Sequence, residues 1–311
     1  MQEESSMGLV GALGAAWGAI AWLFQNIAMA FYNFAYAVTH PQLWLDWSNS
    51  EALMRFIYYG ASAEFFFVVL TAVLVITAIG IWHNRVLWAV VRVLEGFANT
   101  TGRFFAWAGL LMVIQQVVIV VMQRIFNRPD IVLGLGIPVE FDISWYAEEL
   151  KLYNAMVVAM CATYTFVQGG HVRVDLFYAG VRFRTKKVID MIGSLLFMLP
   201  LSVVIWLYGW FFLWRHLVVP NPSASDTLER LLLKARALRW NVETVSFSPN
   251  GFSAYFLFKI LLLCFAGMVF IHAVAFFYRS FLEFKEGEGS SGKYLDRDNV
   301  AEAEEAIDGT H

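Results

Sequence analysis

Charge is what this sequence of 311 residues has least of. Lys, Arg, Asp and Glu make up 15% of its residues, whereas they make up about a quarter of a typical soluble domain. Hydrophobic residues account for 59% and aromatic residues for 17%, and the mean hydropathy is +0.59. This composition excludes an ordinary soluble domain and indicates an integral membrane protein.

Cysteine is also scarce. The two cysteines, Cys161 and Cys264, both lie inside apolar stretches, which predicts buried thiols and neither a disulfide nor a Cys-x-x-Cys metal site. The net charge is −3, most of the acidic excess lies near the C-terminus, and no basic domain stands out. The charge therefore gives no indication of a nucleic-acid partner.

Long apolar stretches are what the sequence does contain. A helix needs about 20 apolar residues to cross a bilayer, and the stretches are continuous, as in helices, whereas barrel strands alternate. The first stretch lacks a basic n-region and is too long for a signal peptide. We therefore expect an all-α integral membrane protein, a bundle of about six transmembrane helices: Gly8–Val38, Ala61–Trp82, Phe104–Phe126, Trp145–Val167, Val188–Trp214 and Ser253–Phe281.

Basic residues predict the orientation of these spans, because they collect in cytoplasmic loops. An even number of spans places both termini on one side of the membrane. The basic cluster between spans four and five also falls on that side, and the connection between spans two and three agrees with it. Both termini are therefore predicted to be cytoplasmic, on the evidence of Arg85, Arg92, Arg103, Arg173, Arg182, Arg184, Lys186 and Lys187.

One basic segment, Asp226–Trp240, falls on the opposite side. Its apolar residues recur at helical spacing, and Asp226 with Glu229 resembles a capping pair. We interpret it as an amphipathic interfacial helix lying on the membrane or on a partner. A different segment, Lys285–His311, is rich in Gly, Ser and acidic residues and is predicted to be a charged, disordered cytoplasmic tail.

Charged residues inside the spans would mark a transport pathway, because each is costly in the bilayer. Lys259 and Glu64 lie close to span ends, where snorkelling or a local pair within the helix explains them. The deeper polar residues are uncharged, as expected for contacts between helices: Gln115, Gln116, Asn154 and His272. We find no internal repeat of broken helices, the usual architecture of a carrier. The chain therefore looks like one subunit of a larger assembly.

The membrane anchor of a respiratory redox complex is the alternative function. Such anchors hold haem between histidines on facing helices. Only His272 lies well inside a span, although His83 and His171 could pair on the cytoplasmic side. The preferred interpretation includes no cofactor and no metal.

Two segments carry most of the functional information. At the start of span four, Trp145 and Tyr146 precede Glu148 and Glu149, which would place carboxylates in the first helical turn, where the helix dipole favours them. At the other end of that span, two glycines are placed to end the helix. The polar residues that follow alternate with valine, as in a strip that meets anionic headgroups: His171, Arg173 and Asp175.

These two segments together resemble the signature of the small membrane subunit of tripartite ATP-independent periplasmic (TRAP) transporters, the DctQ-like family. The segments Val121–Asn127 and Pro249–Tyr255 resemble the end of that family's first helix and the turn before its last helix. The resemblance covers Gly102–Phe284. It implies a four-helix domain over 102–284, two extra N-terminal helices with their connecting loop over 1–101, and the tail over 285–311.

The resemblance implies a non-catalytic scaffold in the bacterial inner membrane. In this family a periplasmic solute-binding protein captures a solute, usually an organic acid, and delivers it to a large membrane subunit for sodium-coupled uptake. The small subunit packs against the large one and the surrounding lipids. By this resemblance, Trp145, Glu148 and Glu149 would orient span four or contact the large subunit. His171, Arg173 and Asp175 would fix the cytoplasmic turn and its lipid or subunit contacts.

Overall fold

The structure is a computed structural model that describes residues 2–134, 138–168, 180–244 and 251–296, without the side chains of 2–10, 12, 13 and 131–141. It divides into two compact units. Unit 1 comprises Met1–Ile79 and Val218–Trp240, and unit 2 comprises Gly80–Leu217 and Asn241–His311. The domain boundary predicted between residues 101 and 102 falls inside a continuous helix of unit 2.

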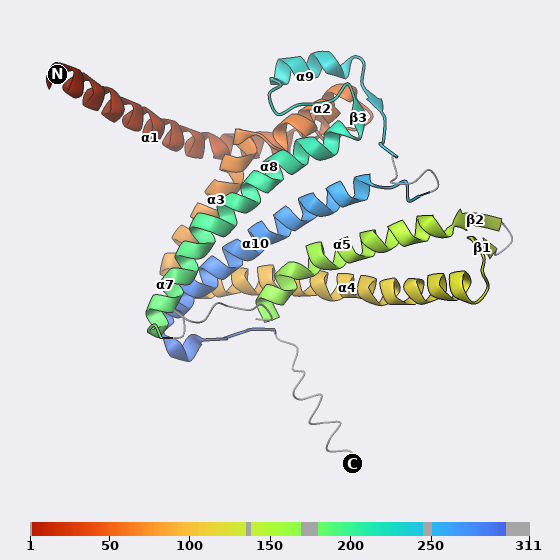
Figure 1. The fold of residues 1–311 in the computed structure, drawn as a ribbon. Coiled ribbons are helices and arrows are strands. Elements are labelled where there is room, and N and C mark those ends of the chain that lie inside the picture. The colour runs from red at the N-terminus through yellow and green to blue at the C-terminus, as the bar shows by residue number, and fades with distance from the viewer. Residues whose placement is uncertain (1, 135–137, 169–179, 245–250, 297–311) are drawn as a thin grey trace. The chain divides into compact units, whose positions relative to one another are not determined.

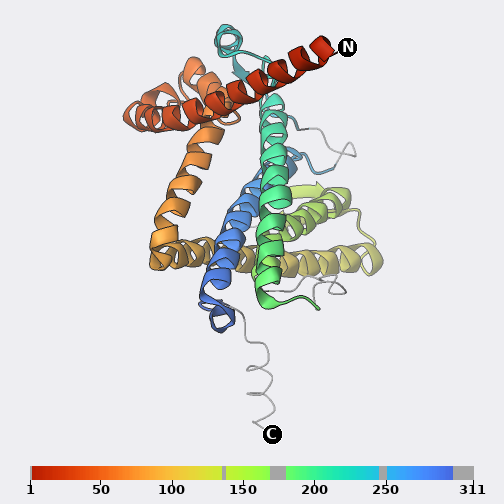
Figure 2. The same ribbon diagram turned by 90° about the vertical axis from the view of Figure 1, so that its left-hand side faces the viewer.

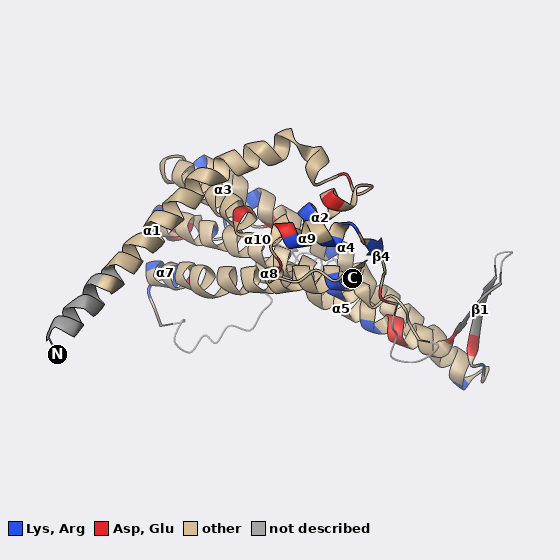
Figure 3. Ribbon diagram, turned by 90° about the horizontal axis from the view of Figure 1, so that it is seen from above, with Lys and Arg blue, Asp and Glu red and all other residues tan. Residues whose placement is uncertain are grey.

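Five helical segments are long and apolar enough to cross a membrane, and they correspond to five of the six predicted spans. Most of their length is free of charged residues (Figure 3). The first predicted span lies within helix α1, Gln2–Thr39, and the count of six stays a prediction. The five segments are α3 (Ala63–Trp82), α4 (Asn84–Arg124), α5 (Ile143–Gln168), α7 with α8 (Phe183–Arg215) and α10 (Phe256–Glu286).

Helix α4 corrects the predicted start of the third span. It begins at Asn84, twenty residues before the predicted Phe104, and contains most of what was expected to be a loop. The reason is an amphipathic pattern that a search for long apolar runs does not detect. The residues of its inward face recur at helical spacing and are buried, while arginines lie along one side of the helix. The inward residues include Leu87, Val91, Ala98 and Gly102.

Unit 1 contains a pair of short amphipathic helices, α2 (Ser50–Tyr59) and α9 (Leu228–Ala235), which pack against each other. Helix α2 begins where the Asn49 side chain accepts a hydrogen bond from the backbone N–H of Glu51, at 2.9 Å. The two-stranded ladder of β3 (Val218–Val219) and β4 (Arg239–Trp240) closes the segment that carries α9. The apolar face predicted for this segment is thus covered within the chain, by α2.

The start of α9 differs from the predicted capping pair of Asp226 and Glu229. Thr227 is the N-cap, and its hydroxyl oxygen accepts a hydrogen bond from the N–H of Arg230 at 3.4 Å. Asp226 is buried and instead forms an ion pair with Lys234 at 2.5 Å. The acidic side chain therefore ties the two ends of the helix together.

Unit 2 is built on an antiparallel pair of helices, α4 and α5, connected through the hairpin of β1 (Asp130–Gly134) and β2 (Pro138–Asp142) (Figure 1). The helices approach each other closely at Gly102 of α4. A Cβ atom there would lie 2.2 Å from Cβ of Tyr164 in α5. Only glycine allows this approach, and the Sγ of Cys161 donates a hydrogen bond to the Gly102 carbonyl at 3.3 Å.

The other helices of unit 2 pack around this pair. Helix α10 contacts α4, α5, α7 and α8 (Figure 2). Helices α7 (Phe183–Gly193) and α8 (Leu199–Arg215) are joined by a π-helical turn, Ser194–Met198, just before Pro200. A kink was predicted at Pro200, and the helix is irregular at this point because the π-helical turn lies directly before the proline. Much of the core lies between α4, α5 and α10: Ala98, Leu152, Met160, Val167, Leu261 and Met268.

The predicted tail begins later than residue 285. Helix α10 includes Lys285 and Glu286 and ends at Gly287, whose φ of +89° favours glycine. The chain then forms a 3-10 turn, Glu288–Ser290. We call Gly287–Asp296 the strap, because it lies against α4 through the contacts described below. Residues 297–311 are outside the described part of the chain.

Candidate functional site

Two groups of polar side chains lie at different ends of unit 2. The first, the α5 cluster, contains Gln115, Tyr146, Glu148, Glu149, Tyr153 and Phe252. The second, the α10 cluster, contains Trp88, Glu95, Lys187, Asp190, Arg279, Glu283, Glu286 and Lys293. Only the first was predicted from the sequence.

In the α5 cluster, Glu148 is 8% exposed and binds a backbone group. One of its carboxylate oxygens accepts a hydrogen bond from the N–H of Phe252, at 2.9 Å. The Phe252 ring lies 5.3 Å from the ring of Trp145, edge to face. These contacts join the start of α5 to the turn that precedes α10.

Glu149 points to a different neighbour. Its carboxylate accepts hydrogen bonds from the side-chain amide of Gln115 in α4, at 2.9 Å, and from the Tyr153 hydroxyl, at 3.1 Å. The same Gln115 amide donates to the carbonyl of Tyr146, at 3.1 Å. The expectation that Gln115 bonds a neighbouring helix is confirmed. The two adjacent carboxylates thus hold α5 to two different segments.

The predicted role of these carboxylates in the first helical turn is wrong. Helix α5 begins at Ile143, so Glu148 and Glu149 lie beyond its first turn. Their charges are stabilised by specific hydrogen bonds and not by the free N–H groups of the helix end. The other predicted site residues, His171, Arg173 and Asp175, lie outside the described residues.

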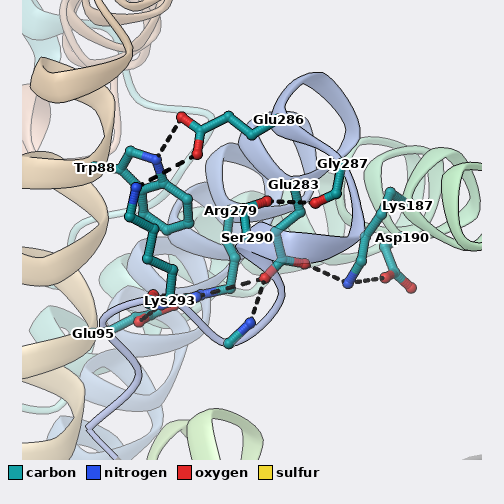
Figure 4. Close-up of polar contacts among 11 residues, drawn as sticks. Trp88, Glu95, Lys187, Asp190, Arg279, Glu283, Glu286, Gly287, Ser290 and Lys293 are labelled. Atoms are coloured by element: carbon teal, nitrogen blue, oxygen red, sulfur yellow. Dashed lines mark hydrogen bonds and ion pairs between the residues drawn. The ribbon is translucent and has the colours of Figure 1, made fainter.

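The α10 cluster is centred on a buried ion pair between Arg279 of α10 and Glu95 of α4 (Figure 4). Two nitrogens of the guanidinium bind the two carboxylate oxygens, at 2.6 and 2.5 Å, and both side chains are less than a tenth exposed. The guanidinium also lies over the Trp88 ring, 5.4 Å from its centre. A bidentate pair fixes both distance and orientation, so it sets the position of α10 against α4.

Helix α7 joins the same cluster through Lys187. Its ammonium group lies 2.6 Å from the carboxylate of Glu283 and 3.7 Å from that of Asp190 (Figure 4). Glu283 also lies 3.7 Å from Arg279. Cations and carboxylates therefore alternate across three helices, so that their charges compensate one another.

The strap is bound to this cluster and to α4. The N–H of Gly292 donates a hydrogen bond to the Glu283 carboxylate, at 3.2 Å, and the Arg279 guanidinium donates one to the carbonyl of Lys293, at 3.0 Å. Farther along, the carboxylate of Asp296 binds the Arg103 guanidinium at 2.9 and 3.1 Å. These hydrogen bonds, followed by one from Asn99, hold the pKa of Asp296 below its usual value.

Contacts at this end of unit 2 involve residues from both of the basic segments that were used to predict the topology. Arg103, from the first segment, binds Asp296 in the strap. Lys187, from the second segment, binds Glu283 near the end of α10. Both segments therefore lie at the same end of unit 2, as the predicted topology requires.

A smaller polar group lies between the end of α8 and the start of α10. Lys259, near the start of the last span, lies 2.6 Å from Glu243, and the His216 ring lies 3.4 Å from the same carboxylate. The hydrogen bond from Lys259 holds the pKa of Glu243 below its usual value, with further lowering by the charges of His216 and Lys259. Lys259 therefore forms an ion pair, but with a residue of the loop before α10 and not with a residue of a helix as predicted.

The remaining candidates for cofactor chemistry are dispersed. The His272 ring is buried between the rings of Phe166 and Phe276, at 5.2 and 6.0 Å. His83 stands at the start of α4. Both cysteines are free thiols. Among the described residues, no three His, Cys, Asp or Glu side chains gather as a metal site would require.

Sequence reasoning missed Glu95, Arg279 and Glu283 as a site. Arg279 and Glu283 are one helical turn apart, a pattern typical of an ordinary surface pair. Glu95 lies in the segment that was assigned to a loop. The site could have been found from the amphipathic pattern of residues 84–103, which places a single acidic residue on the apolar face of a helix.

The comparisons with known proteins identify no relative. No known protein family, characterised protein or solved structure matches the chain. The function must therefore be argued from the residues and their geometry.

Proposed function

We propose that this chain is the small, non-catalytic permease subunit of a TRAP-type transporter, similar to the DctQ-like family. It would anchor a large membrane subunit in the bacterial inner membrane, with both termini in the cytoplasm. Together with a periplasmic solute-binding protein, the complex would take up organic acids by sodium-coupled symport. The resemblance of Glu148, Glu149 and the segment His171–Asp175 to the family signature supports this assignment.

The observation that carries the proposal is how the buried charges are used. In the part of the chain that the structure describes, the buried acidic residues and the buried arginine all have partners within the chain. Glu95 binds Arg279, Glu283 binds Lys187, Asp226 binds Lys234, and Glu148 binds the backbone of Phe252. Charges that are committed to holding helices together leave little for a moving solute or ion. This is expected of a scaffold.

The outward faces of the spans fit the same role. Helix α8 and the π-helical turn before it expose a line of large apolar side chains, with Phe197 at 71%, Leu201 at 60% and Tyr208 at 73%. Helix α4 does the same on its second half, where Trp107 is 66% exposed. Lipid tails or another membrane subunit can cover such faces equally well. A subunit that packs against a larger protein needs surfaces of this kind.

Co-purification tests the proposal. The tagged chain is expressed in its native host, extracted in mild detergent and purified, with an unrelated tagged multi-pass protein as the control. We expect a second, larger membrane protein to be retained with this chain only. Uptake of an organic acid by vesicles should require both proteins, a sodium gradient and a binding protein. Transport by the purified chain alone, or a Soret absorbance band, would overturn the proposal.

A further inference from the structure

Helix α4 is longer than a membrane crossing requires. Its 41 residues extend for about 62 Å at 1.5 Å per residue, about twice the roughly 30 Å of a bilayer's hydrocarbon core. The second half, from Phe104, is the apolar part. The first half carries Arg85, Arg92, Glu95 and Arg103. The charged half therefore lies at the membrane surface, where the strap and the α10 cluster cover its inner face.

The outer face of this first half is apolar. Val86 is 40% exposed, Val93 69%, Phe97 52% and Phe104 69%. They follow one another at intervals of seven, four and seven residues, so they form a single stripe along the helix. Within unit 2 this stripe is uncovered. Its large side chains suit insertion among acyl chains at the bilayer surface.

A row of arginines runs along one edge of the stripe. Arg85, Arg92 and Arg103 are all exposed and are seven and eleven residues apart, which is close to two and three full turns. The helix's single acidic residue, Glu95, points inward to Arg279. The edge therefore carries positive charge next to apolar side chains, as in helices that lie on anionic membranes.

The strap shows that one end of this row binds an oxyanion. The carboxylate of Asp296 lies on the Arg103 guanidinium and accepts a further hydrogen bond from Asn99, at 3.2 Å. The Tyr294 ring lies under the guanidinium of Arg92, at 4.9 Å. A phosphate group presents the same kind of acceptor oxygens to arginine. Asp296 therefore occupies the position that a headgroup phosphate would take at Arg103.

We propose that Arg85, Arg92 and Arg103 bind the phosphate groups of anionic phospholipids while the adjacent apolar stripe enters the bilayer surface, and that Asp296 competes for the Arg103 end. The site is independent of the proposed transport function. It places the first half of α4 in the headgroup region. At the Arg103 end of the row, either the docked strap or a lipid headgroup can bind, but not both at once.

The experiment measures lipid preference around the full chain in phosphatidylcholine vesicles. Spin-labelled phosphatidylglycerol and phosphatidylcholine report their relative association with the protein. We expect the wild-type chain to prefer phosphatidylglycerol. Replacing Arg85 and Arg92 by Gln should reduce the preference by about fivefold for each arginine. The double replacement by Lys, which keeps both charges, should retain it.

A matched control removes the same charge elsewhere. Arg230 of α9 and Arg236 at the C-cap of α9 are exposed, and replacing both by Gln should change the preference less than twofold. Equal loss in this control would mean that net charge alone acts, and the site would be wrong. A wild-type chain without preference, or a Gln variant that keeps it, would also overturn the proposal.

The competition by the strap has its own variant. Asp296→Asn removes the charge that occupies Arg103, and the preference for phosphatidylglycerol should rise by as much as fivefold, the upper range for an exposed ion pair. An unchanged or lower preference in Asp296→Asn would remove the strap from the proposal. Circular dichroism of each variant checks that the helices remain intact.

Discussion

The α5 cluster and the α10 cluster bury carboxylates in the same unit by different chemistry. Glu148 and Glu149 accept hydrogen bonds from neutral donors: a backbone N–H, an amide and a phenol. Glu95 and Glu283 bind cations, Arg279 and Lys187. Neutral donors can be lost one at a time at a limited cost. A buried ion pair that loses one partner leaves an uncompensated charge. The α10 cluster should therefore be the more sensitive of the two.

The largest effect is expected from Arg279→Leu. This change leaves Glu95 buried without its cation and should lower the free energy of unfolding by about 3 to 5 kcal/mol. Unfolding by SDS in mixed micelles measures it. The double variant with Glu95→Leu removes both charges and should recover much of the loss. A double variant as unstable as the single one would show that Arg279 does not act through Glu95.

The next effect tests the neutral donors. Glu148→Ala leaves the Phe252 N–H without its acceptor and should cost about 1 to 3 kcal/mol of unfolding free energy. Glu148→Gln keeps a side-chain oxygen at the same position and should cost less, about 1 kcal/mol or below. The same SDS titration compares them. Equal losses in both variants would mean that the charge of Glu148 matters, and the contrast between the clusters would weaken.

A single hydroxyl gives a smaller effect. Tyr153→Phe removes one of the two donors to Glu149 and should cost about 1 kcal/mol. Tyr208, 73% exposed on α8, provides the matched control, since Tyr208→Phe removes a hydroxyl from the outer surface. Its unfolding free energy should stay at the wild-type value. Indistinguishable variants would show that Gln115 alone satisfies Glu149.

The smallest effect concerns the strap and pH. The pKa of Asp296 is lowered in the folded chain by Arg103 and Asn99, so the ionised form stabilises the docked strap. This contribution is present above the ordinary Asp pKa of about 3.9 and is lost as pH falls through the lowered value. The strap should therefore be docked at neutral pH and released in acid, below about pH 4.

Spin labels can follow this release. Cysteines placed at the exposed positions Ser291 and Val86, in a chain whose two native cysteines are replaced by alanine, report the distance by pulsed electron resonance. The distance distribution should broaden in acid. Asp296→Asn should show the broad distribution at every pH. A distance that stays constant from neutral to acid pH would show that Asp296 does not hold the strap.

Two amphipathic helices show how far the sequence could predict the fold. The pattern in 226–240 correctly indicated a helix with one apolar face, but not its cover, which is α2 of the same chain. The first half of α4 has a similar pattern and was assigned to a loop. Periodicity records which side chains share a face. It does not record what lies opposite that face, because the opposing residues are distant in sequence.

The candidate sites divide in the same way. Glu148 and Glu149 were found because they are adjacent and follow an aromatic pair at the start of a span. Glu95 and Arg279 are 184 residues apart, and each by itself looks like an ordinary charge near a helix end. Nothing local distinguishes a charge that will be buried and paired from one that will face water. Only the packing of α4 against α10 brings them together.

By itself, the sequence determined that this chain is a helical membrane protein. It has few charges and long apolar stretches, so most of its surface suits contact with lipid and not with water. It also determined the approximate position of five spans and the presence of polar groups at their ends, although the helix of the third span begins twenty residues earlier than predicted. The tertiary structure decided which charges are buried, which partner each has, and that the strap lies on α4. These features depend on contacts between segments that are distant in sequence. The energy of each contact depends on the distance between the groups and on their burial, and local periodicity contains no information about either.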